Sequence, residues 1–331
     1  MSASLRPVLI GMFVVVCAGG WYELMWMPES SYQGTLPTAT NEMLALEQEL
    51  HAHVDMLGRQ IGERNLFHYD KLLLAAEYIR AEFKTAGFDV RTQAFDVSGT
   101  ICENLEAEVR GMDRPNDILV IGAHYDSVKG SPGANDNGTG VAAVLALARQ
   151  FAQFPVSRTL KFVAFANEEP PFFQTPHMGS RVYAQRSRER NEHIVLMLSL
   201  ETIGYYTEAP NSQRYPPPLS LIYPSTGNFI GFVSNLANSH WVQRAIRVFR
   251  QHARFPSEGA VLFEWMPGVG WSDHWAFWKE GFPAIMVTDT ALFRDPYYHT
   301  ANDTPDHIHY DHLARVVSGL QHVIRNVANK P

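Results

Sequence analysis

The chain has few cysteines: its 331 residues include only Cys17 and Cys102. Cys17 lies in an apolar N-terminal segment, which leaves Cys102 alone in the part of the chain that is expected to fold. A single cysteine cannot form an intrachain disulfide, and it cannot build a cysteine-based zinc site. Both of these features are therefore excluded.

The chain also lacks any stretch rich in lysine and arginine, and no internal repeat or low-complexity segment is visible. It carries 27 basic and 34 acidic residues, which gives a formal net charge of −7. Nucleic acid is therefore not expected as a partner. Hydrophobic residues make up 46% of the chain and charged residues 18%, values typical of a globular protein with a sizeable core.

No uncharged apolar run reaches the length of a full membrane span. The longest, residues 7–22, is shorter than the ~20 residues that a span needs. Arg6 precedes this run and the next basic residue is Arg59, an asymmetry that places the N-terminus inside and the rest outside. We expect residues 1–27 to be a membrane anchor or, if cleaved near residues 18–20, a signal segment. The protein would then be membrane-anchored or secreted, and periplasmic if its source is a Gram-negative bacterium.

The remaining chain alternates between helical and strand patterns. Residues 28–40 are a predicted linker, and residues 41–331 a single domain. Apolar spacing predicts helices over residues 43–62, 72–87, 138–151, 229–254 and 311–327, and a short helix from Ser272. Strands are predicted over residues 90–95, 105–109, 117–122, 159–166, 194–200 and 284–288. Several of these strands are continuously apolar, as in the buried parallel sheets of α/β proteins.

The segment Ile118 to Gly140 carries the first candidate site. Its strand ends in His124 and Asp126, so both side chains emerge at the carboxyl end, where ligands gather in open α/β sheets. A ligating histidine usually donates its second N–H to a carboxylate, so the pair could be a ligand and its orienting partner. Asp136, in the following turn, could be a second ligand. The alternative is an ordinary polar loop that carries a histidine.

Other strands end in similar residues. Glu168 and Glu169 follow the strand 159–166, Glu201 follows 194–200, and His299 lies in the loop beyond 284–288. Each could instead be an ordinary surface or capping residue. Taken together, two histidines and three carboxylates suit a pair of divalent ions ~3.5–4 Å apart, bridged by one carboxylate and a water. One carboxylate should remain free as a general base.

These residues carry a family resemblance. From about Leu44 to the C-terminus, the chain resembles the co-catalytic di-zinc aminopeptidases of the bacterial leucyl aminopeptidase type. The shared motifs, in the family's order, are His124-Tyr-Asp126, residues 133–140 (GANDNGTG), Asn167-Glu168-Glu169, Glu201 and Tyr298-His299-Thr300.

The resemblance implies a three-layer α/β/α sandwich with a mixed, mostly parallel central sheet and a metal site at the carboxyl edge of its strands. It also implies a role for each motif residue. Asp136 would bridge two zinc ions, with His124 and Glu201 completing one site and Glu169 and His299 the other. Glu168 would be the general base and Asp126 would orient His124. Family members often have Asp in place of Glu201, and they tend to hold the bond after the bridging Asp in the cis form.

The activity implied is hydrolysis of the N-terminal amino acid from peptides, by a metal-bridging water that Glu168 activates. Tyr298 is a candidate oxyanion donor, with an aromatic wall as the alternative. The substrates would be peptides with a free N-terminus. Three rival functions remain: a glutaminyl cyclase-like acyltransferase with one zinc, a carboxypeptidase for acidic dipeptides, and a non-catalytic, receptor-like binding domain.

Overall fold

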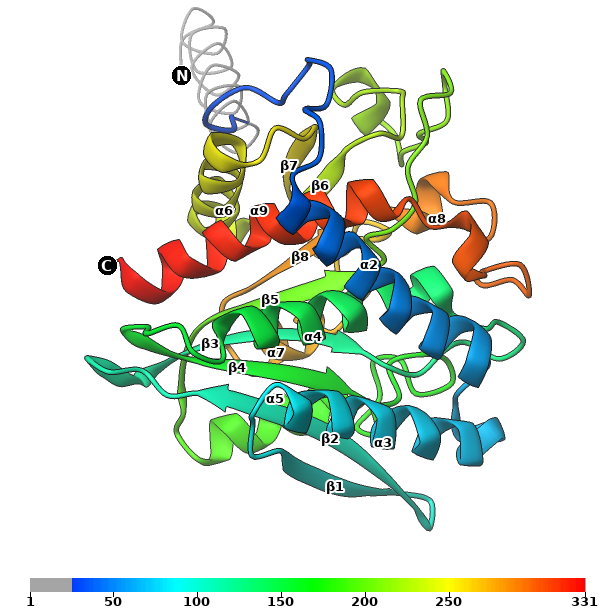
Figure 1. The fold of residues 1–331 in the computed structure, drawn as a ribbon, viewed down its shortest axis with the longest axis vertical. Coiled ribbons are helices and arrows are strands. Elements are labelled where there is room, and N and C mark those ends of the chain that lie inside the picture. Colours follow the sequence, from blue (N-terminus) through cyan, green and yellow to red (C-terminus); the bar gives the residue numbers. More distant parts are fainter. Residues whose placement is uncertain (1–25, 331) are drawn as a thin grey trace, which may run out of the picture.

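A computed structural model describes residues 26–330 of the chain. Within these residues, one mixed sheet runs through the molecule in the order β1-β2-β4-β3-β5-β8-β6-β7 (Figure 1). The strands are β1 (Arg91–Val97), β2 (Thr100–Val109), β3 (Arg114–His124), β4 (Arg158–Phe165), β5 (His193–Glu201), β6 (Ile230–Asn235), β7 (Ser257–Leu262) and β8 (Ala284–Thr288). The central strands β4, β3, β5 and β8 are parallel, so their carboxyl ends meet at one edge.

Helices cover both faces of the sheet. They are α2 (Asn41–Asp55), α3 (Tyr69–Thr85), α4 (Gly140–Phe151), α5 (Gly179–Glu189), α6 (Ser239–His252), α7 (His274–Lys279), α8 (Ala291–Arg294) and α9 (Tyr310–Asn329). In Figure 1, α2, α3 and α4 lie in front of the sheet and α5 and α7 behind it. The predicted three-layer α/β/α sandwich with a mixed sheet is therefore confirmed.

The packing of strand β3 explains why its residues are apolar at successive positions and do not alternate with polar ones. Leu119 and Ile121 pack in the large core that includes the side chains of α4, while Ile118 and Val120 pack with Tyr183 of α5 and others on the opposite face. A strand buried on both faces needs apolar residues at every position. Two layers of helices thus fix the end of β3, and His124 with it.

The prediction of one helix over residues 229–254 was wrong at its start. Residues 230–235 form β6, and only residues 239–252 form the helix α6. A short continuous apolar run does not distinguish a buried strand from a buried helix. The next strand, β7, was not predicted, because its sequence SEGAVL is short and contains a glycine.

The first residues of the predicted linker contact the domain. Arg250 Nη1 donates hydrogen bonds to the carbonyl oxygens of Pro28 (3.2 Å) and Glu29 (2.8 Å). The Ser31 hydroxyl accepts one from the Ser257 N–H of β7 (2.9 Å). The predicted anchor, residues 1–27, lies outside the described residues except for Trp26 and Met27. Within residues 26–330, no helix has the length and apolar character to cross a membrane.

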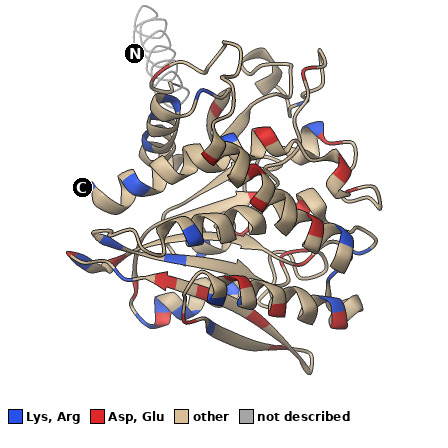
Figure 2. Cartoon of the chain, viewed as in Figure 1, with Lys and Arg blue, Asp and Glu red and all other residues tan. Residues whose placement is uncertain are grey.

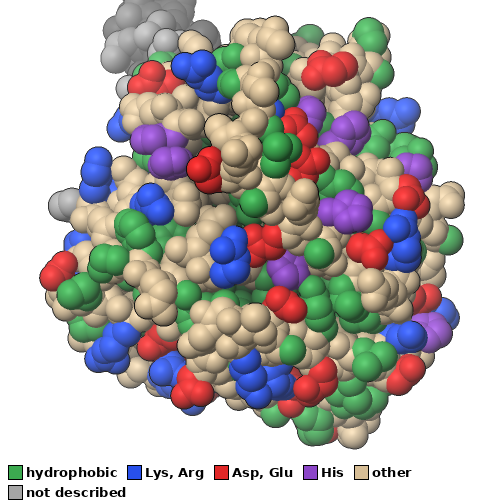
Figure 3. All heavy atoms as spheres, in the orientation of Figure 1, with side chains coloured by type: hydrophobic (Ala, Val, Ile, Leu, Met, Phe, Trp, Pro, Cys, Tyr) green, Lys and Arg blue, Asp and Glu red, His purple; other side chains and the backbone are tan. Residues whose placement is uncertain are grey.

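Charged side chains of both signs are spread over the molecule. Figure 2 shows Lys and Arg distributed among acidic residues along the chain. On the face drawn in Figure 3, basic side chains are separated by acidic, apolar and polar ones, without a continuous basic surface.

Candidate metal centre and active site

The structure brings the five predicted ligands together at the carboxyl edge of the central strands. His124 and Glu201 are the last residues of β3 and β5, and Glu169 lies just beyond β4. Asp136 lies in the turn before α4, and His299 in the loop after α8. The first four are buried, whereas the His299 side chain is 33% exposed.

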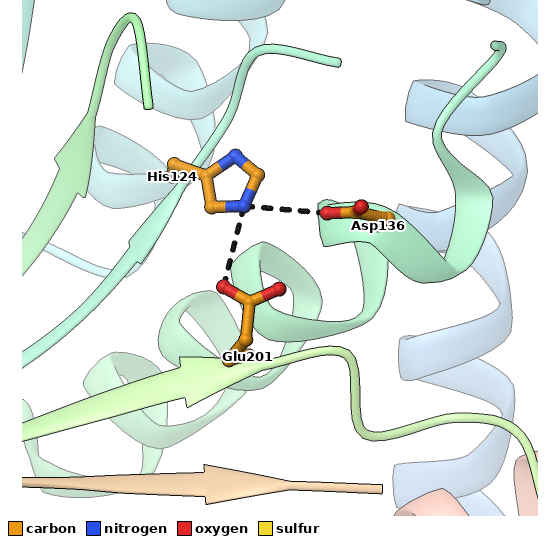
Figure 4. A group of neighbouring side chains, drawn as sticks. All are labelled: His124, Asp136 and Glu201. Atoms are coloured by element: carbon orange, nitrogen blue, oxygen red, sulfur yellow. Dashed lines mark ion pairs between the residues drawn. The ribbon is translucent and has the colours of Figure 1, made fainter. Parts of the chain in front are cut away.

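The five side chains form two groups that share Asp136. In the first, His124 Nε2 lies 3.3 Å from Asp136 Oδ1 and 3.4 Å from Glu201 Oε2 (Figure 4). In the second, His299 Nε2 lies 3.0 Å from Asp136 Oδ2 and 3.4 Å from Glu169 Oε2. Within each group the ligand atoms all lie within 4.8 Å of one another. Asp136 thus presents one oxygen to each group.

The donor atoms fit a zinc site. His124 Nε2, Asp136 Oδ1 and Glu169 Oε1 are buried and have no hydrogen-bond partner. Buried polar atoms without a partner are costly. A cation in the first group would give a partner to His124 Nε2 and Asp136 Oδ1, and a cation in the second group would give one to the Glu169 carboxylate. Burial also raises the pKa of Glu169 to about 8, although His299 opposes this shift. Imidazole and carboxylate are ligand types that zinc prefers.

Asp126 holds His124 and also the turn that carries both glutamates. His124 Nδ1 lies 3.2 Å from the Asp126 backbone oxygen and 3.5 Å from its Oδ1, which leaves Nε2 directed at the first group. The same carboxylate accepts hydrogen bonds from the backbone N–H groups of Glu168 (3.0 Å) and Glu169 (3.1 Å). Sequence reasoning assigned Asp126 to His124 alone; the structure adds the contact with the turn.

Glu168 belongs to neither ligand group. Its Oε2 lies 3.9 Å from His124 Nε2, and burial raises its pKa well above the usual range for a carboxyl group. A buried, uncommitted carboxylate beside a metal centre is suited to act as a general base. The ring of Tyr298 stacks on that of His299 at a centroid distance of 3.9 Å.

Several supporting residues were not predicted. The Asp303 carboxylate accepts hydrogen bonds from the N–H groups of Asn135 (2.8 Å) and Asp136 (3.0 Å), and so fixes the turn of the shared ligand. The peptide bond Asp136–Asn137 is cis, as the family resemblance implied. Ser272 Oγ donates to Glu201 Oε2 (2.7 Å). Asp303 follows the motif around His299, but its sequence position gives no sign of this partner.

An apolar cavity of about 110 Å³ opens beside the centre. Glu201 and Tyr298 line the end nearest the ligands. Its floor is one face of the strands β8, β6 and β7, formed by alternate residues of each strand: Met286, Thr288, Gly231, Val233, Glu258, Ala260 and Leu262. The walls include the aromatic residues Tyr215, Tyr223, Phe229, Trp271 and Phe293. For comparison, an engineered apolar cavity of roughly 150 Å³ binds benzene, so this smaller space suits an apolar group of about that size or less.

The fold and this centre define a class of protein. The sequence model of Peptidase family M28 matches residues 104–324, a segment that contains every candidate site residue. The chain therefore belongs to Peptidase family M28, and it is a metal-dependent peptidase.

Individual relatives agree with this class. The chain is 38% identical over 293 residues to the uncharacterized protein YfbL of Escherichia coli, covering 85% of this chain and 88% of YfbL. It is 24% identical over 224 residues to Leucine aminopeptidase 1 of Arthroderma otae, covering 62% of this chain. The match spans only 54% of that enzyme's length.

Solved structures show the same fold. BSAP, a zinc aminopeptidase from Bacillus subtilis, has a TM-score of 0.70 at 16% identity, with 90% of this chain and 97% of BSAP covered. A glutaminyl cyclase from Tannerella forsythia has a TM-score of 0.61 at 18% identity, with 85% and 98% covered. At these identities the likeness concerns the fold alone, so it does not choose between the two activities.

Proposed function

We propose that the protein is an aminopeptidase that uses two zinc ions to remove the N-terminal residue from peptides. The observation that carries this proposal is the position of Asp136, whose two oxygens face two different histidines at 3.3 Å and 3.0 Å. A carboxylate shared in this way can bridge two ions ~3.5–4 Å apart. His124 and Glu201 would complete one site, and Glu169 and His299 the other.

The chain's own residues supply the proton transfers. When bound, the two ions would polarise the scissile carbonyl and lower the pKa of the attacking water. Glu168 would take the proton from that water and deliver it to the leaving amine. Tyr298, stacked beside His299, would donate a hydrogen bond to the carbonyl oxygen as negative charge develops there.

The surroundings of the centre favour cleavage at a free N-terminus. Buried carboxylates at the centre would attract the positively charged α-amine of a peptide. The apolar cavity begins at Glu201 and Tyr298, so the side chain of the first residue would enter it. The aminopeptidase name of the Arthroderma relative supports the same activity.

The rival functions are less well supported. A glutaminyl cyclase-like acyltransferase with one zinc would not need the second ligand group of Glu169 and His299. A receptor-like binding domain would not need the uncommitted Glu168. A carboxypeptidase for acidic dipeptides would need a basic residue for the substrate's acidic groups, and no Lys or Arg lines the described cavity beside the centre.

The proposal is tested on the full-length protein with and without added zinc. We expect close to two equivalents of zinc, and zinc-dependent cleavage of aminoacyl-nitroanilides but not of their N-acetylated forms. Cyclisation of a glutaminyl peptide with one equivalent of zinc would instead support the acyltransferase. Bound zinc without turnover of any of these substrates would support the binding domain.

We also propose that the domain lies outside the cytoplasm, tethered or secreted through residues 1–27. The charge asymmetry between Arg6 and Arg59 supports this orientation. A reporter enzyme fused to the C-terminus should be active only in the exterior compartment. Reporter activity in the cytoplasm would reverse the proposed topology.

A further inference from the structure

A row of four residues crosses the floor of the apolar cavity. Glu201 of β5 pairs with Thr288 of β8, Thr288 with Gly231 of β6, and Gly231 with Glu258 of β7. All four line the cavity. Neighbouring strands are ~4.8 Å apart, so the three steps separate the backbones of Glu201 and Glu258 by roughly 14 Å.

The middle of this row carries no side chain. Gly231 lines the cavity with its backbone, and the three atoms nearest to a Cβ built there belong to Thr288 and Thr290, at 3.2 to 3.8 Å, so a side chain at this position would crowd its neighbours. The cavity can therefore extend from the metal ligand Glu201 across Gly231 to Glu258. It has a carboxylate at each end, and apolar and aromatic side chains make up most of the wall between them.

Two tyrosines, Tyr215 and Tyr223, line the cavity. The hydroxyl of Tyr215 donates to the Pro224 carbonyl (2.7 Å) and that of Tyr223 to the Gly259 carbonyl (2.9 Å). The two rings stack at a centroid distance of 5.7 Å. Because both hydroxyl protons are committed to the backbone, these residues can offer a ligand only the parts of their rings that are not stacked on each other, and aromatic faces attract cations.

The negative charge of the Glu258 carboxylate is only partly neutralised by its neighbour Arg250. Arg250 Nη2 lies 3.7 Å from Glu258 Oε2, beyond hydrogen-bond distance. The same guanidinium is hydrogen-bonded through Nη1 to Glu29 and through Nε to Ser257. Burial raises the pKa of Glu258, which Arg250 and a hydrogen bond from Ser31 only partly oppose. None of the described residues that line the cavity is Lys, Arg or His.

We propose that Glu258 is a specificity-determining residue that selects peptides with an N-terminal lysine or arginine. This inference rests on the proposed aminopeptidase function. The apolar stem of such a side chain would lie over Gly231 between the aromatic rings, and its charged end would reach Glu258. An N-terminal aspartate or glutamate would be disfavoured, because its carboxylate would approach the like charge of Glu258 in a cavity whose described lining includes no basic residue.

The test compares lysyl-, arginyl-, leucyl- and glutamyl-nitroanilides on the zinc-loaded full-length protein. For Glu258→Gln, the ratio of kcat/KM for lysine over leucine should fall about tenfold, the loss of one partly exposed charged contact. Charge reversal in Glu258→Lys should raise the glutamate-to-leucine ratio. The control Glu77→Gln removes the same charge from an exposed side chain of α3 and should leave both ratios unchanged.

The outcomes separate this inference from the proposed function. If leucyl substrates are cleaved but both ratios stay the same in Glu258→Gln and Glu258→Lys, the role of Glu258 is overturned while the aminopeptidase proposal stands. If the zinc-loaded wild-type protein cleaves none of the four substrates, the aminopeptidase proposal itself fails. Zinc content and circular dichroism of each variant show whether a lost preference reflects misfolding.

Discussion

The metal centre and the apolar cavity lie on the same sheet but are built differently. Three of the five ligands of the centre lie at or just beyond the carboxyl ends of β3, β4 and β5, which three strong apolar runs mark in the sequence. The other two, Asp136 and His299, lie in loops at the same edge. The cavity uses alternate side chains along β6, β7 and β8, together with loops far apart in the chain. The chemistry therefore depends on where strands stop, whereas the choice of substrate depends on which face a strand presents.

The largest effect is expected from removing the shared ligand. Asp136→Ala should abolish binding at both ligand groups, because each group uses one oxygen of this carboxylate. The loss in kcat/KM should exceed the ~10²–10⁴-fold expected from losing a general base alone. Zinc content and turnover are measured together, with Glu201→Gln as the matched variant that disturbs one group only. Retention of two ions by Asp136→Ala would contradict the shared role.

The next effect separates the base from its neighbouring ligand. Glu168→Gln keeps the size of the side chain but cannot accept a proton, so activity should fall ~10²–10⁴-fold with zinc content unchanged. Glu169→Gln should instead bind less zinc, and excess zinc should restore part of its activity. If Glu168→Gln loses zinc and Glu169→Gln keeps it, the two roles are exchanged.

A smaller effect is expected from changing Asp303, which holds the turn of the shared ligand Asp136. Asp303→Asn replaces one carboxylate oxygen by an amide that cannot accept the N–H of Asn135 or Asp136. Zinc affinity should fall ~10–100-fold, as for other residues that orient metal ligands. Zinc titration against a competing chelator measures this change. Unaltered affinity in a folded variant would show that the turn holds its shape without Asp303.

The smallest effect is expected in the cavity. Ala260→Leu enlarges a side chain on the cavity floor, which leaves less room for the substrate's first side chain. The ratio of kcat/KM for leucyl over alanyl substrates should therefore fall ~10-fold. Zinc content should stay at the wild-type level. A fall in zinc content would mean that the cavity and the metal centre are coupled, which would break the distinction between the two regions.

The same distinction explains how far the sequence could predict this molecule. The strands that end at His124, just before Glu168 and at Glu201 were predictable, since continuous apolar runs ending in polar residues are a local pattern. Strand β6 was mistaken for helix, and β7 was missed, because short runs lack a clear period. Asp303 could not be assigned, since its partner Asn135 lies 168 residues away and the contact exists only in the folded chain. The position of Glu258 at the cavity could not be predicted either, because it depends on the pairing of β7 with β6.

The contacts of Asp126 have a consequence for the size of ion that the centre accepts. One residue ties His124, at the end of β3, to the backbone of Glu168 and Glu169, beyond the end of β4. The two strands are also paired from Ile118 to His124. An ion with longer bonds, such as Ca²⁺ at ~2.3–2.6 Å against ~2.0–2.2 Å for zinc, would have to spread these strand ends apart. The backbone itself should therefore discriminate against large cations, independently of the chemical preferences of the ligands.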